Sequence, residues 1–146
     1  MLDDGEEEQV LGIKRMDHVC MVVWKLEERL PMLTELFGMR VAGRFDNPHG
    51  GYNGVVLDIP GGGAQWELLE PASDDSFIAR FLRERGPGLH HVTFEVESVE
   101  KATQALRERG CEPFGGRSHD TYKEVFVHPR DTGGVLFQLY EGGWGA

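Results

Sequence analysis

A chain of 146 residues that is 40% hydrophobic and 10% aromatic can bury one good core, as a single domain or as two tightly fused halves. No stretch approaches the roughly 20 apolar residues that span a bilayer, and no secretory signal opens the chain, so we expect a cytoplasmic protein. The formal net charge of −10, without a basic stripe, argues against nucleic acid and membranes as partners.

The first residues are strongly acidic. Five of the acidic side chains lie between Asp3 and Glu8, and we expect residues 1–12 to form a solvated, disordered tail. The remaining chain is therefore only mildly acidic.

An internal repeat organises the rest of the sequence. The segment DHVCMVVWKLEERLPMLTELFG begins at Asp17, and HHVTFEVESVEKATQALRERG begins at His90. Each reads as a strand followed by a helix that ends at a glycine. His18 and His91 are 73 residues apart, and the later segments WELLE and FQLYE are 71 apart. This near-constant offset indicates two related modules.

The predicted elements follow the same order in each half. The first has a strand at 16–23, a helix at 26–37 and strands at 39–46, 53–59 and 64–70. The second has a strand at 90–97, a helix at 99–109 and strands at 112–116, 122–128 and 134–140. Pro31 fits the first helix only in its opening turn.

These elements predict an α+β fold of two tandem βαβββ modules. The predicted divisions are the tail at 1–12, the first module at 13–72, an amphipathic linker helix within 73–87, the second module at 88–141 and a C-terminal tail at 142–146. The glycines at 61–63 are expected to close a hairpin rather than cradle a phosphate, because a strand and not a helix follows them.

Four polar side chains are predicted to avoid the helix-covered faces. Side chains alternate along a strand, so the apolar neighbours of each of these residues point the other way. The four are His18, Glu67, His91 and Gln138. They occupy repeat-equivalent positions and can meet across a pseudo-twofold axis. Two nitrogen and two oxygen ligands suit one divalent ion such as Co, Ni, Mn, Zn or Fe.

The sequence resembles the vicinal oxygen chelate superfamily, which includes glyoxalases, bleomycin resistance proteins and dioxygenases, and it is most similar to the methylmalonyl-CoA epimerase branch. The resemblance covers residues 16–141 and depends on DHVCMVV, WELLEPASDDSFIARFLRERGPGLHHVTFEV, the helix through LRERG, and HPRDTGGVLFQLYE. It implies a curved mixed sheet around a central metal cavity, a small-molecule substrate such as an acyl-CoA, and a homodimer.

The resemblance also assigns residue roles. His18, Glu67 and His91 match ligand positions, and Gln138 matches a fourth position where epimerase-like sequences usually carry glutamate. In such enzymes a metal-bound carbonyl or thioester forms an enolate while a carboxylate moves the neighbouring proton. Glutamine cannot exchange a proton, so the candidate bases are Glu67 and Asp58. The family's base aligns with Leu57, so Asp58 is expected on the opposite face unless the strand bulges.

The predicted function is therefore a metal-dependent isomerase or epimerase. Two alternatives remain at this point. One is another chemistry of the superfamily, as a glyoxalase-type lyase or an Fe(II) dioxygenase that uses two histidines and Glu67. The other is a non-catalytic small-molecule binding protein, since one fold hosts many functions.

Overall fold

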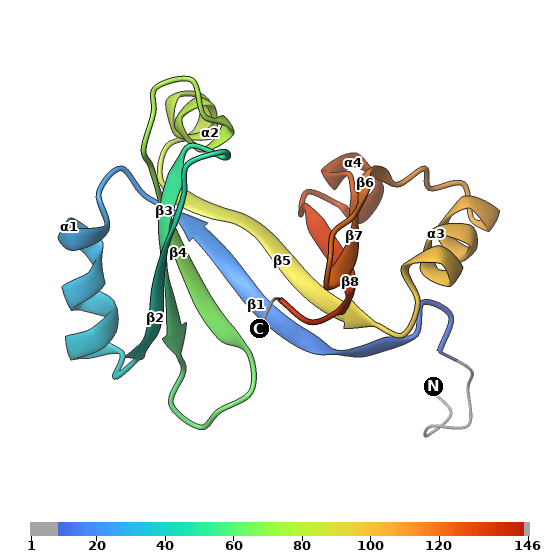
Figure 1. Ribbon diagram of the computed structural model, residues 1–146, viewed down its shortest axis with the longest axis horizontal. Coiled ribbons are helices and arrows are strands. Elements are labelled where there is room, and N and C mark those ends of the chain that lie inside the picture. Colours follow the sequence, from blue (N-terminus) through green and yellow to red (C-terminus); the bar gives the residue numbers. More distant parts are fainter. Residues whose placement is uncertain (1–8, 145–146) are drawn as a thin grey trace. The chain divides into compact units, whose positions relative to one another are not determined.

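The computed structural model describes residues 9–144. Residues 1–8 of the predicted acidic tail and residues 145–146 of the predicted C-terminal tail lie outside the described part. The elements in chain order are β1 (Ile13–Val22), α1 (Leu26–Pro31), η1 (Met32–Leu36), β2 (Arg40–Asn47), β3 (Tyr52–Asp58), β4 (Gln65–Pro71), α2 (Phe77–Arg85), β5 (Gly88–Val96), α3 (Val99–Glu108), β6 (Phe114–Ser118), β7 (Tyr122–Val127), α4 (Pro129–Thr132) and β8 (Phe137–Gly142) (Figure 1).

The described chain divides into two compact units whose boundaries fall inside β1 and β5. One comprises Asp17–Val92 and is called the 17–92 unit; the other comprises residues 9–16 and 93–144 and is called the 93–144 unit. The strand order is β2-β3-β4-β1-β5 in the 17–92 unit and β6-β7-β8-β5-β1 in the 93–144 unit. The matching orders confirm the predicted α+β fold with two βαβββ modules.

Antiparallel strand pairs occur in both units. In the 17–92 unit β1 pairs with β4 in parallel, while β3 is antiparallel to both β2 and β4. In the 93–144 unit β7 is antiparallel to both β6 and β8. Gly61, Gly62 and Gly63 all have positive φ in the turn between β3 and β4, which confirms the predicted hairpin.

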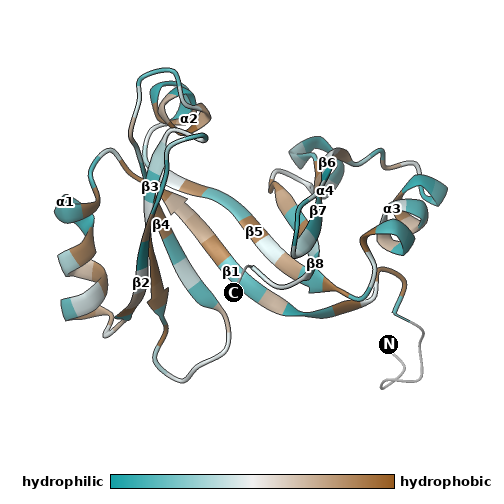
Figure 2. Cartoon of the chain, in the orientation of Figure 1, coloured by the Kyte–Doolittle hydropathy of each residue, from teal (hydrophilic) through white to brown (hydrophobic). Residues whose placement is uncertain are grey.

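Helices cover these strands with their apolar sides, and α1, α2 and α3 each carry both hydrophilic and hydrophobic residues (Figure 2). In the 17–92 unit α1 and η1 bury Leu26, Leu30 and Leu33 against strand residues that include Leu57 and Leu68. In the 93–144 unit α3 packs Val99 and Ala102 against the strand residues Val96, Val125, Val127 and Leu139. Burial of these aliphatic side chains is the main stabilising term of each unit.

The first predicted helix differs from expectation at Pro31. This proline is the last residue of α1, not part of its opening turn, so that prediction was wrong. Proline lacks the N–H that would continue the helical pattern and crowds the carbonyl four residues earlier. The chain continues instead as the π-helix η1, whose wider turn brings the Phe37 N–H to the Met32 carbonyl at 3.3 Å.

Two short features near the C-terminus were not predicted. His128 caps the helix α4 by accepting a hydrogen bond from the Arg130 N–H at 3.1 Å. Gly142 ends β8, and the ring centroids of Trp144 and Tyr140 are 4.0 Å apart. Residues 142–144 of the expected tail are therefore packed on the 93–144 unit. Within residues 9–144, no helix is long and apolar enough to cross a membrane.

Candidate metal centre

The register of β1 and β4 fixes which side chains share a face in the 17–92 unit. His18 pairs with Gln65, and Cys20 pairs with Glu67. Met21, Val23, Trp66 and Leu68 contribute to the core beneath α1. Because neighbouring residues on a strand point to opposite faces, His18 and Glu67 lie on the face away from α1, as their sequence positions predicted.

This face is not free of helix, which the sequence had not indicated. Helix α2 packs on part of it and buries Cys20, Val22 and Leu69 together with Ile78 and Leu82. Ser76 begins α2 by accepting a hydrogen bond from the Ala79 N–H at 3.1 Å, as its place before the amphipathic run indicates. The polar group at His18 and Glu67 therefore borders a second apolar core.

His18, Glu67 and His91 come together in the 17–92 unit. One ligand atom from each lies within 4.8 Å of the other two. The Nε2 atom of His18 is 3.6 Å from Oε1 of Glu67, and the Glu67 side chain is 18% exposed. Two imidazole nitrogens and a carboxylate oxygen at this spacing form a donor set that fits a divalent transition metal.

Asp17 fixes the orientation of the first histidine. Its Oδ2 atom accepts a hydrogen bond from Nδ1 of His18 at 2.7 Å, and both residues are buried. When the ring is neutral and Nδ1 carries the proton, Nε2 has a free lone pair, and this atom is the one near Glu67. A carboxylate behind a histidine is the usual arrangement at metal sites, where it holds the ring and makes its nitrogen more basic.

A second group, Cys20, His90 and His91, overlaps the first through His91. The Nδ1 atoms of His90 and His91 are 2.8 Å apart, although neighbouring residues on a strand ordinarily point to opposite faces. Burial and then the adjacent Glu67 raise the pKa of the Cys20 thiol, so the sulfur keeps its proton. The group that contains Glu67 consists of three of the four residues predicted from the sequence, and it is the candidate metal site.

Burial favours the uncharged form of His91, one of the candidate ligands. It lowers the pKa of His91 well below its ordinary value, with smaller contributions from His90 and His18. Burial and the nearby Arg85 also lower the pKa of His90 to about 4. Since metals bind the neutral imidazole, His91 needs no deprotonation near neutral pH before it can coordinate an ion.

Asp58 lies on the same face as Glu67, contrary to the sequence prediction. It pairs with Gln65 in a register of β3 and β4 that has no bulge, and its Oδ1 accepts a hydrogen bond from Nε2 of Gln65 at 2.9 Å. Leu57 is fully buried beneath α1. The prediction failed because it aligned Leu57 with the family's base and therefore placed Leu57, instead of Asp58, on the face with Glu67.

Gln138 belongs to the 93–144 unit and is 8% exposed. Its Oε1 accepts a hydrogen bond from Oγ1 of Thr93 at 2.7 Å, and its Nε2 donates to Oε1 of Glu124 at 2.8 Å. The neighbouring Leu139 packs beneath α3, so Gln138 points away from that helix, as predicted. Its role as a ligand remains a prediction from the repeat.

Three polar residues around these groups were not identified from the sequence. Asp17 stands in the DH dipeptide, Gln65 is two residues before Glu67, and Glu124 is the polar neighbour of the helix-facing Val125. The period of two along a strand could have indicated Gln65 and Glu124. It could not indicate their hydrogen-bond partners, which depend on the register between strands.

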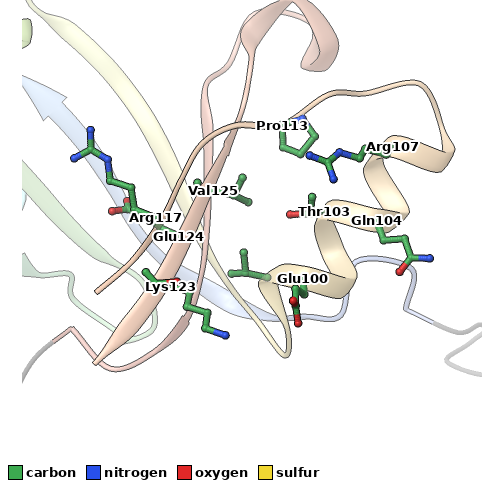
Figure 3. A pocket seen from close by; sticks show the side chains of 12 residues that line it. Glu100, Thr103, Gln104, Arg107, Pro113, Arg117, Lys123, Glu124 and Val125 are labelled. Atoms are coloured by element: carbon green, nitrogen blue, oxygen red, sulfur yellow. The ribbon is translucent and has the colours of Figure 1, made fainter. Parts of the chain in front are cut away.

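A hollow of about 580 Å³ opens in the 93–144 unit between α3 and strands β6 and β7 (Figure 3). Val99, Thr103 and Arg107 of the helix and Lys123 and Val125 of β7 contribute to its lining. None of the predicted site residues lines it. Helix α3 forms one wall of the hollow, and Glu124 of β7 also contributes to its lining.

The fold agrees with the comparisons to known proteins. The Glyoxalase/Bleomycin resistance protein/Dioxygenase superfamily profile matches residues 17–127. The chain belongs to this superfamily.

Several individual relatives and solved structures similar to this chain are named as epimerases. The chain is 32% identical to the ethylmalonyl-CoA/methylmalonyl-CoA epimerase of Cereibacter sphaeroides, across 87% of this chain and 97% of that one. Among solved structures, methylmalonyl-CoA epimerase from Mycobacterium tuberculosis has a TM-score of 0.81 and 28% identity, with 94% of each chain covered. A Streptomyces coelicolor methylmalonyl-CoA epimerase variant in complex with 2-nitronate-propionyl-CoA has a TM-score of 0.76 and 26% identity, covering 90% of this chain and 99% of that one.

Proposed function

We propose that this chain is a metal-dependent epimerase of the methylmalonyl-CoA epimerase type, which moves the proton next to the carbonyl of an acyl-CoA thioester. The observation that carries the proposal is the partly buried group of His18, Glu67 and His91, whose ligand atoms lie within 4.8 Å of one another. The epimerases among its relatives and structural neighbours support the same reaction class.

His18, Glu67 and His91 hold one divalent ion, with Gln138 as the fourth ligand that the sequence repeat predicts. Co, Ni, Mn, Zn and Fe all accept such nitrogen and oxygen donors. The ion supplies positive charge that stabilises the negative charge developing on the thioester oxygen when the neighbouring carbon loses its proton. Asp17 keeps the His18 ring in its binding orientation.

Asp58 is the proposed base. It shares a face with His18 and Glu67, and Gln65 holds its Oδ1, which leaves Oδ2 to take the proton. The carbon–hydrogen bond at C2 breaks, its electron pair moves towards the thioester oxygen, and Asp58 receives the proton. Inversion needs a second proton on the opposite side of C2. Glu67, the second carboxylate on this face, would supply it after leaving the ion and taking a proton from solvent, and Asp58 would return its own proton to solvent.

The test is solvent deuterium exchange at C2 of methylmalonyl-CoA, followed by mass spectrometry. The metal-loaded protein should exchange this hydrogen, and Asp58→Asn should slow the exchange by about 100-fold or more while metal content is unchanged. Asp46→Asn, on the exposed face of edge strand β2, serves as the matched control. Metal-loaded wild-type protein that leaves C2 unexchanged would overturn the proposal.

A second function has one specific observation in its favour. Two histidines and one carboxylate also form the facial triad of non-haem Fe(II) dioxygenases. Bound iron together with oxygen uptake would identify that chemistry, whereas the epimerase consumes no oxygen. The cytoplasmic location and the homodimer stay predictions from the sequence and its resemblance.

A further inference from the structure

The side-chain amide of Gln138 is held at both ends within the 93–144 unit. Its nitrogen donates to Glu124 at 2.8 Å, and its oxygen accepts from the hydroxyl of Thr93 at 2.7 Å. Thr93 is fully buried, and Gln138 is nearly so. A buried amide with two such partners has one favoured orientation.

Glu124 decides which orientation that is. An ionised carboxylate only accepts hydrogen bonds, so it must face the NH2 group of the amide and would repel the carbonyl oxygen. The Thr93 hydroxyl can either donate or accept and therefore tolerates both orientations. Because the nitrogen is directed to Glu124, the oxygen of Gln138 is directed towards β5, the strand that carries Thr93.

Glu124 is itself well held. Its Oε2 atom lies 2.6 Å from Nε2 of His119, and its side chain is 11% exposed. The His119 ring stacks on Tyr122 with 4.2 Å between ring centroids. Glu124 of β7 pairs with Tyr140 of β8, and Tyr140 lies two residues after Gln138 on the same strand. The side chains of Glu124 and Gln138 therefore share a face. The carboxylate therefore approaches the amide from a constrained position.

We propose that Glu124 is a positioning residue that makes Gln138 present its carbonyl oxygen, not its NH2 group, to a divalent ion. The proposal rests on the assignment of Gln138 as a metal ligand in the proposed function. It explains how an amide can act as a metal ligand at this position. Only the amide oxygen can coordinate an ion, and an acceptor that holds the NH2 group directs the oxygen to the ion.

The first test needs no metal. Nitrogen-15 NMR spectra of the metal-free protein measure how fast side-chain NH2 hydrogens exchange with solvent. The Gln138 signals are identified by their loss in Gln138→Leu. The Gln138 hydrogens should exchange at least about 10-fold more slowly than those of exposed Gln9. Glu124→Leu, which has no acceptor, should abolish this protection. Glu124→Gln should keep most of it, because its carbonyl can still accept. Protection that survives Glu124→Leu would overturn the proposal.

The second test measures metal affinity by chelator competition, with Co²⁺ and Zn²⁺ as probes. Glu124→Leu should weaken binding about 10- to 100-fold, the usual effect of losing a residue that orients a ligand. Glu124→Gln should stay within a few-fold of wild type, which separates the acceptor role from a loss of negative charge. Glu112→Leu removes an exposed carboxylate that pairs with Arg107 and should change nothing.

The outcomes separate the two proposals. Wild-type protein that binds no divalent metal would overturn the metal centre, while the amide signals still test the positioning role. Wild-type protein that binds metal while Glu124→Leu binds it equally well would overturn the role of Glu124 and leave the metal centre standing. Weaker binding in Glu124→Leu with recovery in Glu124→Gln supports both.

Discussion

His18 is constrained on both sides of its ring, with Asp17 at Nδ1 and Glu67 facing Nε2. This arrangement makes the ring position independent of the metal itself. The ligand group is then preorganised, because little side-chain freedom is lost when an ion binds. We therefore propose that Asp17 contributes to the metal affinity of this centre without touching the ion.

Asp17→Asn should weaken binding of a divalent metal by about 10-fold or more. The amide can still accept a hydrogen bond from His18, but it makes the imidazole nitrogen less basic and can rotate away. Chelator competition on the purified variant provides the measurement. Unchanged affinity in a folded Asp17→Asn protein would show that the carboxylate does not support the ligand.

A carboxylate at position 138 should conflict with Glu124. In Gln138→Glu, two carboxylates would replace the 2.8 Å amide–carboxylate contact, and we expect the metal-free protein to lose about 1–3 kcal/mol of unfolding free energy. The exchanged pair Glu124→Gln with Gln138→Glu restores the hydrogen bond in the reverse direction. It should recover to within about 1 kcal/mol of wild type in urea denaturation. Equal stability of the single and double variants would contradict this account.

Helix α2 is the element that borders the ligand group. It packs Ile78 and Leu82 against Cys20, Val22 and Leu69, all on the face that carries His18 and Glu67. The helix was predicted from the serine cap and the spacing of its apolar residues. Its residues Phe77 and Phe81 contact the His90 ring and contribute to the burial that lowers the pKa of His90.

Ile78→Ala should destabilise the protein by about 2–5 kcal/mol, because Ile78 is fully buried and the cavity left behind cannot close completely. Denaturant unfolding monitored by circular dichroism measures the change. Arg80→Ala, on the exposed side of the same helix, is the matched control and should stay within about 0.5 kcal/mol of wild type. A loss below 1 kcal/mol for Ile78→Ala would mean that α2 is not firmly packed.

The elements also show where sequence reasoning succeeds. Alternation along β1 and β4 was enough to place His18 and Glu67 on the face away from α1, because their strand neighbours pack beneath that helix. It failed at Asp58, where the side of the strand was inferred from an aligned neighbour instead of from the burial of Leu57. It also missed η1, because a proline predicts an interruption but not the wider turn that follows.

At the scale of the whole molecule, the internal repeat predicted the βαβββ modules and the strand at which each candidate ligand lies. It could not predict the hydrogen bonds of Gln138, which depend on how β7 and β8 pair. Nor could it give the identity of the ion, because histidine and carboxylate ligands suit several metals.

Metal binding should stabilise the folded chain. An ion that binds only the native state adds about 2.7 kcal/mol of unfolding free energy when its free concentration is 100 times its dissociation constant. Thermal unfolding with and without added Co²⁺ or Zn²⁺ measures this effect. The melting temperature should rise for wild type and not for His18→Ala, and an equal rise in both proteins would place the ion elsewhere.

The central claim is that His18, Glu67 and His91 hold a divalent metal, and elemental analysis of the metal-reconstituted, desalted protein tests it most directly. The account predicts one divalent transition-metal ion per wild-type chain and its loss from His91→Ala, with both proteins folded by circular dichroism. A wild-type chain that retains no such ion, or a His91→Ala chain that retains it in full, would contradict the account.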